Sequence, residues 1–428
     1  MALLKDYSEK YNELVTFLPN KSEPIHRWYS FVEGYSSKLV EQIIDEQINL
    51  PNVCLDMFGG VGTTALACQS RNIECISIET SPFFYEVAKT KLEAESFSYE
   101  EIEYLISTIK GSLLLKKGLV QHPKLDSKTF FESKDKAKWV FHRTASNGIF
   151  DIIEVIDSLC INGSMKYKGL LRISLASILQ EISNVFKNGK CLSYKKNWRE
   201  KKYTRKQVHD LFINHLTDIV LPDLKKSHLK KCINTENIIL GDSRKAISEI
   251  NKKIDLVITS PPYLNSRDYT DVYRLELWML GYINTFNKER KQRSQSLVSH
   301  VQIPILDVPF PSIKELKDVI KFLESDKAIL WNKEIPKMIK GYFNDIEGIL
   351  KELKKKLNPN AKVYINVSNS AYSNYVIEVD IIISKIAELL GYSCEEIRIA
   401  RLIRTSNQQK KHIDTSKMRE SIIVLKNT

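Results

Sequence analysis

The chain has 428 residues, of which 43% are hydrophobic and 27% charged, with 15 Gly and 13 Pro. This composition excludes collagen-like, disordered and disulfide-scaffold proteins, and it allows a sizeable buried core. The length predicts two or three domains. No apolar stretch approaches the ~20 residues that cross a bilayer, and residues 1–20 lack the apolar centre of a signal peptide. We therefore expect a soluble intracellular protein.

The charge indicates a class of partner, and the cysteine content bears on disulfides and metal sites. Lys and Arg number 64 against 52 Asp and Glu, which gives a net charge of +12. Such an excess favours polyanionic partners, although many unrelated proteins are equally basic. The seven cysteines are odd in number and widely spaced, with no C-x-x-C pair and no histidine cluster. We expect reduced, mostly buried thiols and no metal site.

The first apolar-periodic region predicts a strand–helix–strand unit. Asn52–Phe58 and Cys75–Glu79 have the composition of short buried strands, and Thr63–Arg71 between them has helical spacing. Helical spacing resumes from Phe84 to about Glu95. This order is typical of the opening βαβ unit of a doubly wound parallel sheet.

A second periodic region begins near Thr235 and alternates strands with helices. The predicted strands are Ile238–Leu240, Asp255–Thr259, Lys362–Val367, Cys394–Ala400 and Ser421–Leu425. The predicted helices are Ser243–Ile250, Tyr342–Leu357 and Ile377–Leu390, the last ending at a Gly391 C-cap. Together the two regions predict an α/β fold with a doubly wound, mostly parallel sheet of seven strands.

Two insertions interrupt this pattern. The first, residues 96–234, lacks the alternation, and its segment Lys187–Lys206 holds nine Lys and Arg, one acid and three aromatic residues. A charge run alone is most often a solvated helix face, but interleaved aromatics also suit a surface that follows phosphates and stacks on bases. The second insertion, about 284–336, contains Ser312-x-x-Glu315, which predicts a capping box at a helix start.

A glycine turn ends the first strand in the run Asp56-Met-Phe58-Gly59-Gly60-Val-Gly62. Glycines let the backbone turn sharply and lie against a ligand, and the helix from Thr63 offers free N–H groups to an anion. Glu79, at the end of the next strand, can accept hydrogen bonds from two ribose hydroxyls. The turn also matches a dinucleotide motif, but Asp56 would repel a pyrophosphate and instead suits the ammonium of a methionine moiety.

Ser260-Pro261-Pro262-Tyr263 follows an apolar strand and should lie at the carboxyl edge of the sheet, where α/β folds bind ligands. Two prolines make a rigid loop with free carbonyl oxygens. The Ser260 hydroxyl and the Pro261 carbonyl can hold the hydrogens of an exocyclic amine and aim its lone pair at a sulfonium methyl group. Tyr263 can stack on a base that has left its duplex. A simple strand-ending turn is the alternative.

These motifs resemble those of the site-specific DNA amino-methyltransferases that use S-adenosyl-L-methionine. Asp56, Phe58, Gly60 and Gly62 look like their cofactor motif, and Ser260–Tyr263 looks like their catalytic motif. Pro24–Tyr29, continuing to Glu33–Ser36, resembles the segment that completes their cofactor pocket. The resemblance implies a Rossmann-like methyltransferase fold and the following cofactor-binding residues: Trp28, Asp56, Phe58, Gly59, Gly60, Gly62, Thr63, Glu79 and, for adenine, Asp242.

The order of the motifs implies a division of the chain. Residues 1–95 and 235–428 would form the catalytic domain, with Ser260, Pro261, Pro262 and Tyr263 as catalytic residues. Residues 96–234 would form an inserted, mainly helical target-recognition domain. Its predicted DNA-binding residues are Lys195, Lys196, Arg199, Lys201, Lys202, Arg205 and Lys206. The basic residues Arg398, Arg401, Arg404, Lys410, Lys411 and Lys417 are equally compatible with phosphate contact and with solubility.

In this family a serine at the first position of the tetrapeptide suggests cytosine N4 as the acceptor, whereas aspartate more often accompanies adenine N6. The resemblance thus implies a cytosine-N4 methyltransferase acting on double-stranded DNA in a prokaryotic cytoplasm, associated with the nucleoid when bound to DNA. It would be the modification enzyme of a restriction–modification pair with a cognate endonuclease. The alternatives are an adenine-N6 enzyme, an RNA base methyltransferase and a non-catalytic DNA-binding subunit.

Overall fold

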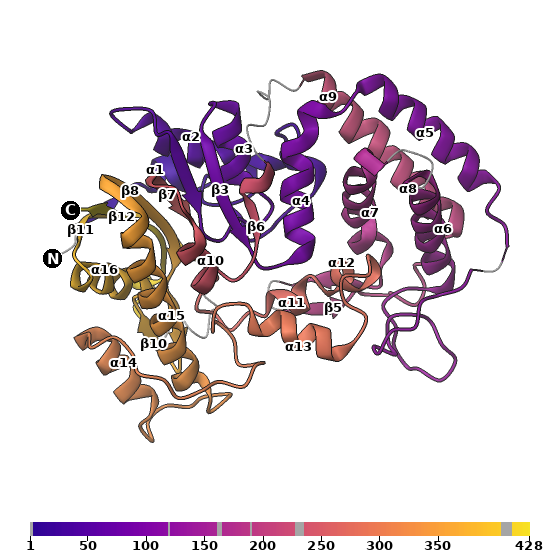
Figure 1. The fold of residues 1–428 in the computed structure, drawn as a ribbon. Coiled ribbons are helices and arrows are strands. Elements are labelled where there is room, and N and C mark those ends of the chain that lie inside the picture. Colours follow the sequence, from indigo (N-terminus) through magenta and orange to yellow (C-terminus); the bar gives the residue numbers. More distant parts are fainter. Residues whose placement is uncertain (1–2, 119, 161–164, 189–190, 227–234, 404–412) are drawn as a thin grey trace.

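The computed structural model describes residues 3–118, 120–160, 165–188, 191–226, 235–403 and 413–428 (Figure 1). Its centre is one sheet with the strand order β1-β11-β12-β8-β7-β2-β3-β6. The strands are β1 (Leu4–Asp6), β2 (Val53–Asp56), β3 (Glu74–Glu79), β6 (Ile238–Leu240), β7 (Ile254–Thr259), β8 (Leu357–Ser368), β11 (Tyr392–Leu402) and β12 (Arg419–Asn427).

The sheet is mostly parallel, as the sequence predicts. Only β12 runs antiparallel to its two neighbours, β8 and β11. The seven predicted strands are all present, but the count of seven is wrong because β1 adds an eighth by pairing in parallel with β11. Its three residues are exposed and carry no apolar periodicity, so sequence pattern could not identify them.

Helices cover both faces of the sheet. Alternation along the strands explains this, because Cys54, Leu256 and Ile258 face one core cluster, whereas Leu55 and Val257 face another. The first face carries α2 (Ser37–Asp45) and α3 (Thr63–Ser70). The second carries α10 (Ser243–Glu249), α15 (Ile335–Lys356) and α16 (Val379–Leu389). The doubly wound arrangement therefore follows from strands that are apolar on both sides.

The first insertion is mainly helical and forms the lobe to the right in Figure 1. Its elements are α5 (Tyr99–Leu114), α6 (Arg143–Leu159), α7 (Lys168–Ile182), the hairpin β4 (Val185–Lys187) and β5 (Leu192–Tyr194), α8 (Arg205–His215) and α9 (Leu221–Lys226). One core cluster joins this lobe to α4 (Pro82–Leu92) and α12 (Arg274–Met279). Within that contact, the buried Lys187 Nζ lies 2.8 Å from Glu276 Oε1, which also accepts from the Tyr29 hydroxyl.

The second insertion contains α13 (Phe286–Ser294) and α14 (Lys314–Leu323), and it follows α11 (Tyr269–Val272) and α12. The predicted capping box at Ser312 is wrong. Helix α14 begins one residue later, after Ile313, and no side chain caps it. Glu315 is drawn instead into an ion pair with Lys385 of α16. Among the helices that the structure describes, none is both long and apolar enough to span a membrane.

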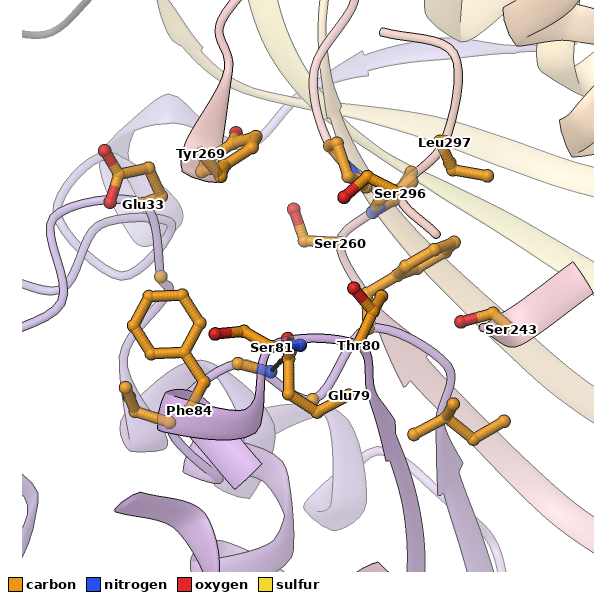
Figure 2. A pocket seen from close by; sticks show the side chains of 18 of the residues that line it. Glu33, Glu79, Thr80, Ser81, Phe84, Ser243, Ser260, Tyr269, Ser296 and Leu297 are labelled. Atoms are coloured by element: carbon orange, nitrogen blue, oxygen red, sulfur yellow. Dashed lines mark hydrogen bonds between the residues drawn. The ribbon is translucent and has the colours of Figure 1, made fainter. Parts of the chain in front are cut away.

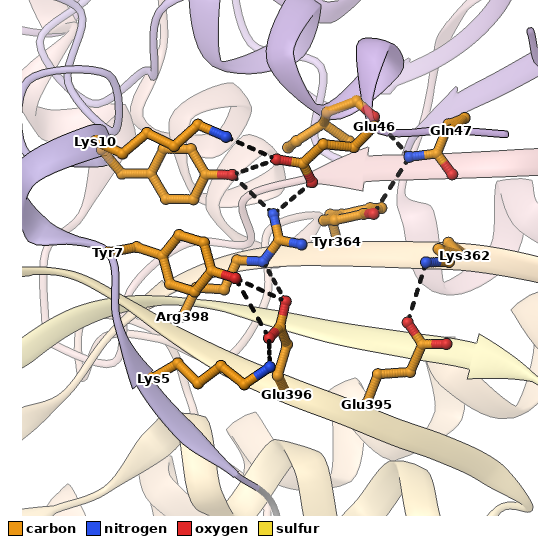
Figure 3. Close-up of polar contacts among 12 residues, drawn as sticks. Lys5, Tyr7, Lys10, Glu46, Gln47, Lys362, Tyr364, Glu395, Glu396 and Arg398 are labelled. Carbon is orange, nitrogen blue, oxygen red and sulfur yellow. Dashed lines mark hydrogen bonds and ion pairs between the residues drawn. The ribbon is translucent and has the colours of Figure 1, made fainter.

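A buried arginine fastens the N-terminal residues to the sheet. Arg398 on β11 donates to Glu396 Oε1 at 2.6 Å, to Glu46 Oε2 at 2.6 Å and to the Tyr11 hydroxyl at 2.7 Å (Figure 3). Of the other C-terminal cations that could contact phosphate, Arg401 pairs with Glu420 and Lys417 with Glu378, and the remaining three lie outside the described residues. The donors of Arg398 are thus engaged within the protein, where they stabilise the fold.

Replacing Arg398 should destabilise the fold, because Arg398→Ala leaves two largely buried carboxylates without their main partner. We expect a fall in the free energy of unfolding of about 3 kcal/mol in urea denaturation. Lys362→Ala is the matched control, since Lys362 forms a half-exposed pair with Glu395 beside this network (Figure 3). That change should cost less than about 1 kcal/mol. Equal losses for the two variants would contradict the structural role of Arg398.

Candidate functional site

A cavity opens at the carboxyl edge of the sheet, where β2, β3 and β7 end side by side. Its walls include Asp56 and Gly60 from the first motif, Glu79 from β3, and Ser260 and Tyr263 from the proline tetrapeptide. In Figure 2, Ser260 and Tyr269 lie across the cavity from Glu79 and Ser81. Parallel pairing thus brings together residues about 200 positions apart in the chain.

The glycine turn has the close packing that its sequence predicts. Gly60 and Gly62 have φ angles of +52° and +81°, a region that disfavours side chains. A Cβ on Gly59 would lie 1.9 Å from the Ser77 hydroxyl, and one on Gly62 would lie 2.9 Å from the Ala88 Cβ. Phe58, Gly59, Gly60 and Thr63 line the cavity, whereas Gly62 lies behind it as the N-cap of α3.

Asp56 is buried, and three protein groups donate to its carboxylate. The Thr259 hydroxyl donates at 2.8 Å and the Phe58 N–H at 3.1 Å to Oδ1, while the Tyr35 hydroxyl donates at 3.0 Å to Oδ2. Burial nevertheless raises the pKa of Asp56 above its ordinary value. A carboxylate has about four acceptor positions, so Asp56 can still accept from one donor of a ligand in the cavity.

Glu79 is held by backbone amides at the floor of the cavity. Its Oε2 accepts from Gly60 N–H at 2.8 Å and its Oε1 from Ser81 N–H at 2.7 Å. Burial outweighs these bonds and raises the pKa of Glu79 to about 7. Near neutral pH, Glu79 can therefore lose its proton and, as a carboxylate, accept hydrogen bonds from a ligand.

Asp242 lines the cavity, but Arg244 occupies much of its carboxylate. Asp242 caps α10 by accepting from Arg244 N–H at 3.0 Å, and the Arg244 guanidinium lies 2.7 Å from Oδ2. Arg244 is itself held by Asp345 of α15 at 3.1 Å. The predicted adenine contact would thus use only the acceptor capacity that Arg244 leaves free.

Trp28 does not fit its predicted cofactor role. Its side chain is fully buried in the core and stacks on Phe97, with ring centroids 6.4 Å apart, and it is absent from the cavity wall. Phe31, Gly34 and Tyr35 of the same N-terminal segment line the cavity instead. The indole packs because the aromatic cluster of the helical lobe extends under this segment.

Several cavity residues carry no sequence motif. Phe84 of α4 and Tyr269 of α11 supply apolar walls, and Ser296 and Leu297 follow α13 of the second insertion (Figure 2). Gln292 of α13 fastens this wall by donating to the Thr80 carbonyl at 2.8 Å. Only contact across the sheet edge identifies these residues, because nothing in their spacing distinguishes them from ordinary helix termini.

The proline tetrapeptide Ser260–Tyr263 leaves β7 directly after Thr259. The Ser260 hydroxyl donates its single hydrogen to the Asn366 carbonyl at 3.0 Å, so its lone pairs remain as acceptors. Pro261 is buried, and Pro262 is half-buried beside it. The Tyr263 ring lines the cavity, while its hydroxyl donates to Glu420 Oε1 at 2.5 Å. An amine in this position would meet oxygen acceptors on a rigid loop.

The basic segment divides into structural and exposed cations. Lys195 Nζ donates to three carbonyls at the end of α7, Gln180, Glu181 and Ser183, at 2.7–2.8 Å. Arg205 forms a bidentate pair with the buried Asp151. The donors of Lys195 and Arg205 are thus engaged by protein groups, which argues against the predicted phosphate contacts of these two residues. The cations that remain exposed are Lys196, Arg199, Lys201, Lys202 and Lys206.

Of the aromatic residues of this segment, Trp198 is buried, whereas Tyr194 and Tyr203 are half-buried. Trp198 is 7% exposed and meets Trp139 edge-on, with ring centroids 5.1 Å apart. Tyr194 lies 5.2 Å from Trp198, and the Tyr203 hydroxyl contacts Glu181. Of the two properties that favour nucleic-acid binding in the sequence, the positive charge is exposed, whereas the aromatic rings are buried or half-buried.

Three cysteines form the one metal-like cluster among the described residues. The sulfurs of Cys54, Cys68 and Cys75 lie within 4.8 Å of one another, although no spacing motif predicts this. Contact between these thiols, together with burial, raises the pKa values of Cys54 and Cys75. Their surroundings are the apolar core between β2 and α3, where thiols pack as small hydrophobic groups.

The cavity has the chemistry that an S-adenosylmethionine cofactor needs. Asp56 offers a buried carboxylate, Glu79 an acceptor for ribose hydroxyls, and Phe31 and Phe84 apolar faces. Glycines leave room at the turn, where a side chain would collide with Ser77. The residues that line the cavity therefore fit an adenosine with a charged amino-acid tail.

Comparisons with known proteins agree with this site. A family model for N6/N4-type DNA methylases matches residues 15–90, which include the glycine turn and Glu79. The chain is 27% identical over 470 residues to the Type II methyltransferase M.BsoBI of Geobacillus stearothermophilus, with 97% of this chain and 88% of that protein covered. It is 28% identical over 426 residues to the Type II methyltransferase M.AvaI of Nostoc sp., covering 90% and 83%. No solved structure matches the chain.

The family model and the two relatives agree with the cavity in pointing to one kind of chemistry. Members of this family take their methyl group from S-adenosylmethionine, the cofactor that the cavity fits. Together these findings support a site-specific DNA amino-methyltransferase.

Proposed function

We propose that the protein methylates the N4 amine of cytosine at a short site in duplex DNA, as the modification enzyme of a type II restriction–modification pair with a cognate endonuclease. The observation that carries this proposal is the Ser260 hydroxyl, whose hydrogen is committed to the Asn366 carbonyl. An acceptor-only oxygen beside two prolines suits an amine that must be held by its hydrogens. Serine in this position accompanies cytosine N4 in the family that the chain resembles, and the relatives are named Type II methyltransferases.

The chain's part in the reaction is to bind and orient. The cofactor supplies an electrophilic methyl group on a sulfonium. Asp56 would hold its ammonium and Glu79 its ribose hydroxyls, and Tyr263 supports the extruded base from one face. Ser260 and the Pro261 carbonyl accept from the amine and so direct its lone pair toward the cavity that Asp56 lines.

DNA recognition is assigned to the first insertion, residues 96–234. Its five exposed cations, Lys196, Arg199, Lys201, Lys202 and Lys206, follow the β4–β5 hairpin. The Lys187–Glu276 pair joins that hairpin to α12, which follows the catalytic loop in the chain. A cationic surface attached in this way can set the register of the duplex relative to Ser260.

The atom that receives the methyl group tests this function directly. Duplex DNA incubated with the protein and S-adenosylmethionine, digested to nucleosides and analysed by mass spectrometry, should yield N4-methylcytidine as its deoxynucleoside. N6-methyladenine would reassign the target base. Label that enters transfer RNA alone would indicate an RNA enzyme, and no cofactor binding in calorimetry would indicate a non-catalytic subunit.

The role of Glu79 predicts a pH-dependent cofactor affinity. Ribose hydroxyls donate to the carboxylate form, whereas the raised pKa of about 7 means that Glu79 is protonated below neutral pH in the free protein. Protons therefore compete with the cofactor, and its Kd should rise about tenfold from pH 8 to pH 6, because about a tenth of the groups stay ionised at pH 6. Calorimetry on Glu79→Gln should give weaker binding with a flat profile. A wild-type Kd that does not change between these pH values would contradict the assignment.

The exposed cations predict a salt-dependent affinity for DNA that does not depend on its sequence. Lys196→Ala, Lys201→Ala and Lys202→Ala combined should weaken binding and lower the slope of log K against log salt by about 3. The matched control combines Lys253→Ala, Lys351→Ala and Lys355→Ala, exposed lysines near the amino ends of β7 and β8, opposite the cavity. The control should leave the slope unchanged. If the first variant kept the wild-type slope, these lysines would be solvated side chains that do not contact phosphates.

A further inference from the structure

The hydroxyl of Tyr263 lies in a polar cage formed with Asn366 and Glu420, away from the cavity. It donates to Glu420 Oε1 at 2.5 Å and accepts from Asn366 Nδ2 at 2.9 Å. The same amide nitrogen lies 3.2 Å from Glu420 Oε1, so the three groups close a triangle. Burial and the Glu420 carboxylate raise the pKa of Tyr263 well above its ordinary value, so the hydroxyl keeps its proton.

Glu420 is itself fixed from the other side. It is 2% exposed, and its second oxygen, Oε2, accepts from Arg401 Nε at 2.7 Å and Nη2 at 2.6 Å. Arg401 faces Glu420 across the β11–β12 pair. A buried carboxylate requires such partners, and this pair leaves Oε1 free to hold the tyrosine.

The cage stands on rigid elements. Asn366 belongs to β8 and Glu420 to β12, neighbouring antiparallel strands at the centre of the sheet. Side chains on strands are held more precisely than those on loops. Tyr263, in contrast, belongs to the loop after β7, so its hydroxyl is the link through which the sheet can fix its ring.

The geometry points to Glu420 and Asn366 as positioning residues that orient the Tyr263 ring for stacking on the extruded target base. This inference rests on the proposed function, in which Tyr263 supports that base. The side chains of both residues act through the hydroxyl, and neither residue lines the cavity. A ring fixed before DNA arrives loses less freedom on binding, which explains why the loop carries Tyr where Phe would also stack.

A double-mutant cycle with Tyr263→Phe and Glu420→Ala tests the linkage. Tyr263→Phe keeps the ring and leaves Asn366 and Glu420 paired with each other, so the protein should fold. We expect about a tenfold lower kcat/KM for DNA, which corresponds to about 1.4 kcal/mol, with an unchanged Kd for S-adenosylmethionine. Because Glu420 acts through the hydroxyl, adding Glu420→Ala to Tyr263→Phe should cause no further loss. Glu420→Gln should retain most activity by keeping an acceptor.

Two further variants exclude a general structural effect. Tyr364→Phe removes a buried hydroxyl from the same strand as Asn366, one that accepts from Gln47 at 3.2 Å on the far side from the cavity, and it should leave kcat/KM unchanged. If Glu420→Ala does not fold, the positioning role is tested with Tyr263→Phe and Glu420→Gln alone. The quantity compared is then the kcat/KM for DNA of each variant relative to wild type.

The outcomes separate this inference from the proposed function. A wild-type protein that transfers no methyl group to DNA would overturn the proposed function itself. With an active wild type, the positioning role is overturned if Tyr263→Phe matches wild type, if the two single losses multiply in the double variant, or if cofactor affinity falls together with turnover.

Discussion

The hydrogen bond from Thr259 to Asp56 joins the two halves of the site. It spans 2.8 Å between neighbouring parallel strands, one ending in the glycine turn and the other in the catalytic loop. Because Thr259 immediately precedes Ser260, any shift of β7 against β2 would move the acceptor oxygens of the Ser260 loop relative to the Asp56 carboxylate. The register Cys54–Leu256 and Leu55–Val257, fixed by apolar packing on both faces, therefore sets how the Ser260 loop lies relative to Asp56.

Buried and half-buried ion pairs hold the parts of the chain around that centre. Lys187 and Glu276 tie the helical lobe to α12, Arg398 ties the N-terminal residues to β11, and Arg401 steadies the acid that anchors Tyr263. Each uses a cation that a count of charges would assign to DNA. The net charge of +12 thus overstates the surface available to phosphates, and the DNA contact that we propose uses the smaller exposed set that includes Lys201 and Lys202.

Sequence pattern predicted the parts whose signals are local. A strand that is apolar on both faces, such as β7, must be buried on both faces. Glycines in a turn indicate a backbone that other residues disfavour. The exposed strand β1 and the cavity residues Ser296 and Leu297 have no such local signal, because their positions depend on neighbours distant in the chain. Trp28 and Arg205 show the same dependence on distant neighbours: their residue types suggest a ligand contact, whereas in the structure a core ring packs on Trp28 and a buried acid pairs with Arg205.

The central claim is that one cavity brings the cofactor and the target amine together. A crystal structure with sinefungin, which carries an amine in place of the sulfonium methyl, would test it most directly. The account predicts that the ribose hydroxyls of sinefungin lie within hydrogen-bond distance of Glu79 and that its extra amine faces Ser260. Sinefungin bound elsewhere, or turned so that this amine points away from the proline loop, would contradict it.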